Sequence, residues 1–130
     1  MKMIDAPICV VDDDESVRTA IVRLLKSVGE DSRSFASGEA FLAADVVRST
    51  RLLIIDVRMK GASGLDVQAA LRSQALPIPL VFISAHADVA LRDAALAAGA
   101  AGFLSKPFSA DALLAHVPAR SFNITPPEVP

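Results

Sequence analysis

Two acidic segments each follow a short run of apolar residues. Asp12–Asp14 come directly after Ile8–Val11, and Asp56 comes directly after Leu52–Ile55. A short apolar run that ends in acid indicates a buried strand whose charged residue reaches the edge of a sheet. If two such strands are neighbours, their carboxylates repel each other and need a cation nearby. Oxygen ligands of this kind suit Mg²⁺, and a carboxylate beside Mg²⁺ can act as a nucleophile toward phosphorus.

Length and composition restrict the class of protein. The 130 residues are enough for one domain with a hydrophobic core, and 52% hydrophobic residues argue against disorder. The net charge of −2 predicts no nucleic-acid or membrane surface on this chain. The single cysteine, Cys9, lies in a predicted strand, where a small buried apolar role is expected. Residues 1–7 resemble neither a signal peptide nor a membrane span, and we expect a cytoplasmic protein.

Five short apolar segments alternate with five segments of helical periodicity. This alternation predicts an α/β domain in which right-handed crossovers build a parallel sheet covered on both faces. The predicted strands are Ile8–Val11, Ser32–Ala36, Leu52–Val57, Leu80–Ser84 and Gly102–Ser105, of which the second is polar and expected near an edge. The predicted helices are Glu15–Val28, Ser37–Val47, Ser63–Ala75, Asp88–Ala98 and Ser109–Val117. Asp14 suits the N-cap of the first helix, and Gly29 suits its end.

Polar residues fall at the carboxyl ends of four predicted strands, the edge at which such sheets bind ligands. They are Asp12, Asp13, Asp56, Ser84 and Lys106. Simpler roles are open to most of them: the first two acids could form a solvated turn, Ser84 could end its strand, and Lys106 could be an exposed lysine near acids. Asp56 is harder to explain in this way, because an aspartate after so apolar a run risks a buried unpaired charge.

The order and spacing of these pieces resemble the receiver domain of two-component response regulators, in particular the FixJ type. The resemblance covers about residues 7–118, and its short motifs are specific only as an ordered set. They are Val11-Asp12-Asp13-Asp14, Ile55-Asp56-Val57-Arg58-Met59, Gly64, Ile83-Ser84-Ala85-His86, Gly99-Ala100, Phe103 and Lys106-Pro107-Phe108. The family implies a doubly wound, flavodoxin-like (CheY-like) sheet of five parallel strands in the order 2-1-3-4-5, with five helices.

The resemblance implies a phosphoacceptor and a metal site. Asp56 would accept a phosphoryl group from a sensor histidine kinase or a phosphotransfer protein. Asp13, Asp56 and the backbone carbonyl of Arg58 would bind Mg²⁺ directly, with Mn²⁺ as a possible substitute, and Asp12 would act largely through water. This division suits phosphoryl transfer, which depends on positioning and on charge stabilisation.

The resemblance also implies which residues respond to phosphorylation. Lys106 would bind one phosphoryl oxygen, Ser84 would move to bind another, and Phe103 would rotate to report the change. Arg58 and His86 would tune how fast water removes the phosphoryl group. Without the family, Phe103 suits an ordinary core aromatic, and His86 suits a solvated loop residue.

Two features depart from the family pattern. Lys60 follows Met59, where receivers usually have proline, and this change could affect loop rigidity, Mg²⁺ affinity or partner choice. The last helix ends early at Pro118, which leaves a phosphorylation-dependent homodimer open, since many receivers dimerise through that helix. Pro107 is expected to be structural, and the Lys106–Pro107 peptide bond could be cis.

Three function classes compete, and a phosphorylation-dependent signalling switch is favoured. A pseudo-receiver that never takes phosphate would not need Asp13, Asp56 and Lys106 together. A metal-dependent phosphohydrolase would need an aspartate where Arg58 stands, so we expect no enzyme beyond the receiver's own Mg²⁺-dependent phosphorylation and dephosphorylation. A flavin site would need a phosphate-binding loop after the first strand, and the sequence has none there.

Residues 119–130 contain three prolines and are expected to form a tail or part of a linker. FixJ-type proteins normally continue into a DNA-binding output domain, and this sequence has no basic recognition helix. The chain could therefore belong to a longer protein with such an output domain, or act alone through protein contacts. Neither nucleic acid nor a membrane is expected to bind this chain.

Overall fold

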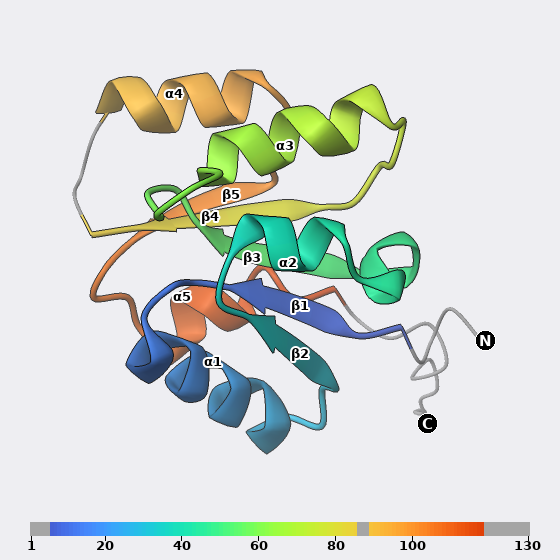
Figure 1. Ribbon diagram of the computed structural model, residues 1–130. Coiled ribbons are helices and arrows are strands. Elements are labelled where there is room, and N and C mark those ends of the chain that lie inside the picture. The colour runs from blue at the N-terminus through green and yellow to red at the C-terminus, as the bar shows by residue number, and fades with distance from the viewer. Residues whose placement is uncertain (1–5, 86–88, 119–130) are drawn as a thin grey trace, which may run out of the picture.

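Five parallel strands form one sheet, in the order β2-β1-β3-β4-β5, in the computed structural model (Figure 1), which describes residues 6–85 and 89–118. The strands are β1 (Ile8–Val11), β2 (Ser32–Phe35), β3 (Leu52–Asp56), β4 (Leu80–Ser84) and β5 (Gly102–Ser105). Every residue of β1, β3 and β4 is buried, because helices cover both faces of the sheet. The predicted fold class and strand order are confirmed, and the polar strand β2 lies at an edge.

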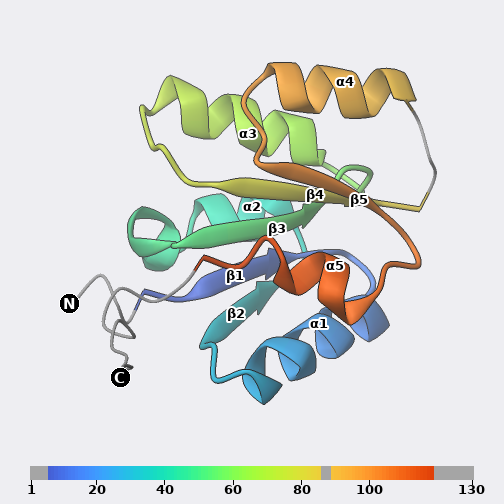
Figure 2. The ribbon, with the colours of Figure 1, turned by 180° about the vertical axis from the view of Figure 1, so that it is seen from behind.

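Helices cover the sheet in two layers. They are α1 (Glu15–Ser27), α2 (Gly38–Leu42), the 3₁₀ helix η2 (Asp45–Ser49), α3 (Gly64–Ser73), α4 (Val89–Ala97) and α5 (Ala110–Leu114). Helices α1 and α5 lie on one face, and α2, α3 and α4 lie on the other, as the two opposite views show (Figures 1 and 2). No helix in the described ranges is long and apolar enough to cross a membrane.

Side chains pointing to opposite faces of the sheet form two separate hydrophobic clusters. In β1, Cys9 and Val11 join the cluster under α2, α3 and α4, whereas Ile8 and Val10 join the cluster under α1 and α5. This alternation follows from strand geometry, in which successive side chains point to opposite faces. The described parts of the two clusters share no residue.

The second predicted helix, Ser37–Val47, is too long. Helix α2 ends at Leu42, and Ala44 adopts an extended backbone with φ −82° and ψ 146° before η2 begins. The break allows both Val46 and Val47 to be buried. In an unbroken α-helix these two neighbours would point about 100° apart.

The last predicted helix, Ser109–Val117, is also too long, since α5 ends at Leu114. The chain continues in tight turns, in which the amides of His116 and Val117 donate to carbonyls three residues earlier, each at 3.0 Å. Such bonds are typical of helix ends that narrow to 3₁₀ geometry. The caps of α1 are as predicted: Asp14 accepts hydrogen bonds from two amides at its start, and Gly29 after its end has a φ of +80°.

Candidate functional site

The two acidic segments meet where the strand order reverses. Strands β1 and β3 are hydrogen-bonded neighbours, and Val11 is paired with Ile55, so Asp12 and Asp56 follow side by side. Asp12 is completely buried, and only 6% of Asp56 is exposed, whereas Asp13 is exposed. Neighbouring carboxyl ends therefore bring these side chains together at the edge where doubly wound folds bind ligands.

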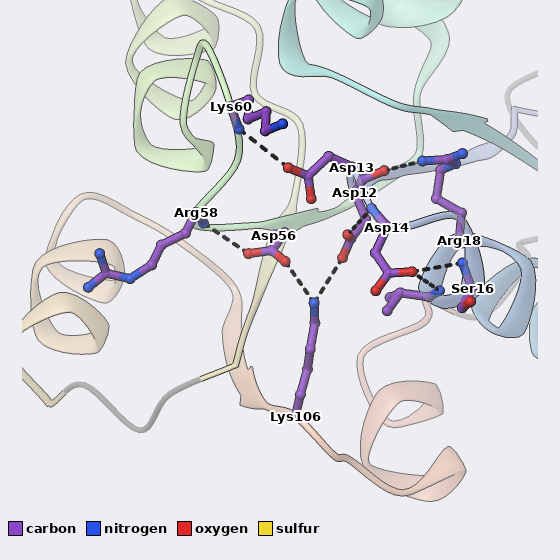
Figure 3. A network of polar contacts seen from close by, with 10 residues as sticks. Asp12, Asp13, Asp14, Ser16, Arg18, Asp56, Arg58, Lys60 and Lys106 are labelled. Carbon is purple, nitrogen blue, oxygen red and sulfur yellow. Dashed lines mark hydrogen bonds and ion pairs between the residues drawn. The ribbon is translucent and has the colours of Figure 1, made fainter.

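Lys106 comes from a strand two places away from β3 in the sheet, and its side chain contacts both buried acids. It follows β5, and its backbone amide donates to the carbonyl of Ser84 at 2.7 Å, which continues the pairing of β4 with β5. Its Nζ donates to Asp56 Oδ2 at 2.7 Å and to Asp12 Oδ2 at 3.1 Å (Figure 3). The peptide bond between Lys106 and Pro107 is cis.

The site changes the proton affinities of its own groups. Burial raises the pKa of the Asp12 carboxyl, and the nearby negative charge of Asp56 adds to this rise, against the hydrogen bonds from the Asp14 amide and Lys106. Burial alone would lower the pKa of the Lys106 ammonium. Its hydrogen bonds and ion pairs with Asp56 and Asp12 outweigh that effect, so the pKa of Lys106 is raised overall. At neutral pH the lysine therefore stays charged between the two acids.

One backbone amide donates to each of the three acids. The amide of Arg58 donates to Asp56 Oδ1 at 2.9 Å, and the amide of Lys60 reaches Asp13 Oδ2 at 3.4 Å. The amide of Asp14 donates to Asp12 Oδ1 at 2.8 Å. In Figure 3 the guanidinium of Arg58 points away from the three acids, so this residue meets the site through its backbone.

Two other residues predicted for the site lie in the neighbouring strands β4 and β5. Ser84 ends β4 one residue after Ile83, the partner of Asp56, and it is buried. Phe103 is half-buried in β5, and its ring lies 6.4 Å from that of Phe82, centroid to centroid. His86 lies outside the described residues.

The acid cluster has the chemistry of a divalent-cation site. Asp12, Asp13 and Asp56 offer the hard oxygen ligands that Mg²⁺ prefers, and their three formal charges exceed the single charge of Lys106, which contacts two of them. Across residues 6–85 and 89–118, however, no three acidic, histidine or cysteine side chains are gathered closely enough to hold a metal ion. Lys106 lies between Asp12 and Asp56, and Asp13 is turned toward Lys60 (Figure 3). The residues fit Mg²⁺ in type, since carboxylate oxygens are the ligands that it prefers.

One side-chain contact and one backbone contact of the site were not predicted. Arg18 in α1 donates from Nη1 to the backbone carbonyl of Asp12 at 2.6 Å, so it fixes the turn that carries the acids. The signal was present in the sequence, because Arg18 lies one helical turn after the N-cap Asp14 and can reach back to that turn. The contact of the Lys60 amide with Asp13 had no such signal, because every residue except proline carries a backbone amide.

A known protein family and known structures match this sequence and this fold. The sequence model of the response regulator receiver domain matches residues 8–118, which is most of the chain. The chain therefore belongs to this family, whose members act as phosphorylation-dependent signalling switches of two-component systems.

Individual relatives agree with the family. The transcriptional regulatory protein TdiR of Thauera aromatica is 40% identical over 110 residues, covering 85% of this chain and 48% of that protein. The response regulator protein TodT of Pseudomonas putida strain F1 is 42% identical over 113 residues, covering 86% and 49%. The crystal structure of FixJ-N superimposes with a TM-score of 0.79 at 32% identity, covering 90% of this chain and 92% of that one. The chain spans about half the length of the curated relatives it matches.

Proposed function

We propose that Asp56 is the residue that accepts the phosphoryl group, from a phosphohistidine of a sensor histidine kinase or a phosphotransfer protein. The observation that carries this proposal is the two-sided hold on its carboxylate, by Lys106 Nζ on Oδ2 and by the Arg58 amide on Oδ1. Asp12 also contacts the lysine but is completely buried, and Asp13 is exposed and is turned toward the Lys60 amide instead of Lys106. Asp56 is therefore oriented from two sides and, at 6% exposed, it is the more accessible of the two acids that Lys106 contacts.

The transfer needs little covalent help from the protein. A carboxylate oxygen of Asp56 forms a bond to phosphorus while the bond from phosphorus to the imidazole nitrogen breaks. The electron pair of the broken bond stays on that nitrogen, and the imidazole leaves neutral when its other ring nitrogen carries a proton. Lys106 supplies a positive charge at the carboxylate, where negative charge gathers during transfer. Water later attacks the acyl phosphate and returns Asp56 to a carboxylate.

A bound Mg²⁺, or Mn²⁺ in its place, would neutralise charge on the transferring group and bring it to the carboxylate. We infer that Asp13, Asp56 and the carbonyl of Arg58 would hold the ion directly, and that Asp12 would act through water. The excess of negative charge at the acid cluster supports this inference, because Lys106 alone does not balance it.

The phosphorylated state is proposed to act through Ser84, Lys106 and Phe103. Phosphorylation adds a charge of about −1.5 to −2 and three strong acceptor oxygens, which the Ser84 hydroxyl and the Lys106 ammonium would bind. The half-buried Phe103 would then change its packing against Phe82, and so transmit the change toward α4 and β5. Arg58, together with His86, would tune the lifetime of the acyl phosphate.

The output of the switch is proposed from the relatives. TdiR is named a transcriptional regulatory protein, and the chain spans about half of it. We propose that this receiver passes its signal to an output domain of a longer protein or to a separate partner, in the cytoplasm, and that phosphorylation promotes self-association. The receiver itself is proposed to bind neither nucleic acid nor a membrane, and to turn over no external substrate.

The test is intact-protein mass spectrometry after incubation with acetyl phosphate and Mg²⁺. Wild type is expected to gain one phosphoryl group only when Mg²⁺ is present, and Asp56→Asn is expected to gain none. Asp93→Asn, an exposed aspartate on α4, serves as the matched control and should behave as wild type. A folded wild type that gains no phosphoryl group, or an adduct that persists in Asp56→Asn, would contradict the assignment.

A further inference from the structure

Three alternate amides of the loop after β3 each donate to a carboxylate, and the three carboxylates come from different elements. The Arg58 amide donates to Asp56 at the end of β3, and the Lys60 amide reaches Asp13 after β1. The Ala62 amide donates at 3.0 Å to Oε2 of Glu39, a residue in the first turn of α2. The first two acids belong to the site described above, whereas Glu39 lies on a different element and has no role there.

The contact with Glu39 is closely fitted. Gly61 has a φ of +75°, and a Cβ atom built on it would lie 2.6 Å from Oε2 of Glu39. The left-handed backbone of Gly61 and its missing side chain therefore let the loop close on the carboxylate. Glu39 receives the Ala62 amide on one side of the loop and fills the space beside Gly61.

Lys60 makes this arrangement specific to the chain's own sequence. A proline at position 60 would have no amide to donate to Asp13, and its ring would restrict the loop by itself. With lysine there, the loop lacks that restriction, and its position depends on the hydrogen bonds of the Arg58 and Ala62 amides on either side. One of these is the bond to Glu39, two residues further on.

We propose that Glu39 is a positioning residue for phosphorylation, which holds the loop so that the Arg58 carbonyl and the Lys60 amide stay at the acid cluster. The proposal rests on the proposed function of Asp56. Glu39 touches neither substrate nor metal, and it acts through the Ala62 amide. Its loss should loosen the loop and lower the affinity of the site for Mg²⁺, without changing the chemistry once Mg²⁺ saturates the site.

The matched control lies in another short helix of the same design. Glu39 in α2 and Asp111 in α5 each occupy the second helical position after a serine N-cap. In both helices the serine side chain accepts a hydrogen bond from the backbone amide of the third helical residue, at 3.1 Å for Ser37 and 3.0 Å for Ser109. Asp111→Ala removes the same favourable charge at a helix start but touches no part of the loop.

The first measurement is the rate of phosphorylation by acetyl phosphate as Mg²⁺ is varied, together with Mg²⁺ binding followed by amide chemical shifts. Glu39→Ala is expected to weaken Mg²⁺ binding about three- to tenfold, the range for one charge-assisted hydrogen bond that is weakened by its exposure to solvent. The rate at saturating Mg²⁺ should stay within about twofold of wild type. Glu39→Gln keeps a carbonyl acceptor and should recover most of the affinity, and Asp111→Ala should match wild type. Equal Mg²⁺ affinity in Glu39→Ala and Asp111→Ala overturns the proposal.

The second measurement needs no metal and no phosphate. Hydrogen exchange at the Ala62 amide should be faster in Glu39→Ala than in wild type, and unchanged in Asp111→Ala. Gly61→Ala should lower the free energy of unfolding less in the Glu39→Ala background than in wild type. The backbone strain at φ +75° remains in both, but the contact with Oε2 is gone in the Glu39→Ala background. If wild type takes no phosphoryl group, the proposed function fails and these exchange rates still decide the role of Glu39. Unchanged exchange at Ala62 overturns that role.

Discussion

At the scale of single residues, the completely buried carboxylate of Asp12 lowers the stability of the folded state when it is charged. It is removed from water beside Asp56, and its pKa is raised first by that burial and then by the neighbouring charge. A raised carboxyl pKa means that the folded protein binds the proton more tightly than the unfolded chain does. The charged form of Asp12 therefore lowers the stability of the fold at neutral pH.

Asp12→Asn should consequently stabilise the protein at pH 7, by about 1 kcal/mol, since it removes a buried charge whose compensation is shared with Asp56. The advantage over wild type should be full at neutral pH. It should shrink as the pH falls through the raised pKa toward the ordinary value of about 3.9, because wild type then gains the proton. Urea unfolding at several pH values measures it, with Asp93→Asn as the exposed control. A variant less stable than wild type at pH 7 would contradict the sign.

Lys106 contributes in the opposite sense. Its raised pKa shows that the folded state prefers the ammonium, so its contribution is present below the ordinary lysine pKa of about 10.4 and is lost as the pH rises through the raised value. Lys106→Gln should lose about 1–2 kcal/mol at pH 7, less than a completely buried pair because the lysine is partly exposed. The difference from wild type should disappear in strongly basic solution. Chemical unfolding at pH 7 and at a series of pH values up to about 12 tests this, and Lys26→Gln on the surface of α1 serves as the exposed control.

The acids and the lysine could be predicted as a group, since each ends a strand and strand ends share one edge. The details could not. Nothing in the sequence shows that Lys106 divides its bonds between Asp12 and Asp56, or that Asp13 turns toward a backbone amide at Lys60. These choices depend on rotamers and on loop backbone, which residue types do not determine.

At the scale of elements, the start of α3 packs directly on the end of β3 at Gly64. A Cβ atom on Gly64 would lie 2.6 Å from the carbonyl oxygen of Asp56 and 2.8 Å from the ring of Phe82. Backbone on one side and a buried ring on the other cannot move away without shifting the site. The glycine therefore sets how closely helix and strand approach.

Gly64→Ala should destabilise the domain by about 2–3 kcal/mol, the upper part of the range for overpacking a core. Gly29→Ala is the control, because its φ of +80° brings backbone strain but a Cβ atom there meets nothing within 4 Å. It should lose about 1 kcal/mol. Thermal and urea unfolding of both variants measure the difference. Equal losses would mean that the close approach at Gly64 relaxes easily.

Strands were easier to predict than helix ends. Leu80–Ser84 and Gly102–Ser105 have the predicted bounds, because each is a short apolar run with a breaker or a turn at both ends. The second and the last helix were predicted to end at Val47 and Val117, but they end earlier, at Leu42 and Leu114. In both places the chain continues in three-residue turns whose apolar side chains keep a helix-like spacing, so periodicity alone cannot find the true end.

At the scale of the whole molecule, Arg51 joins segments that are distant in sequence. It precedes β3, at the edge of the sheet opposite the acid cluster, and it donates to the carbonyls of Ala6 and Pro118 at 3.2 and 3.0 Å. It also forms an ion pair with Glu30, which lies between α1 and β2. One guanidinium thus holds the first and the last described segments of the domain together.

Arg51→Ala should lower the free energy of unfolding by about 2–3 kcal/mol, since several part-buried hydrogen bonds are lost at once. Phosphorylation by acetyl phosphate should be unchanged, because the acid cluster lies at the other edge. Arg48→Ala, an exposed arginine in η2, should leave both quantities unchanged. A large loss of phosphorylation in folded Arg51→Ala would show that the two edges are coupled.

The division of the interior by the sheet has an evolutionary consequence. Since the described clusters above and below the sheet share no residue, a substitution under α1 and α5 needs no compensating change under α2, α3 and α4. Each helical layer can drift at its own pace while the strands between them stay apolar. Lineages of this fold can therefore change the residues under one helical layer while the packing under the other layer stays the same.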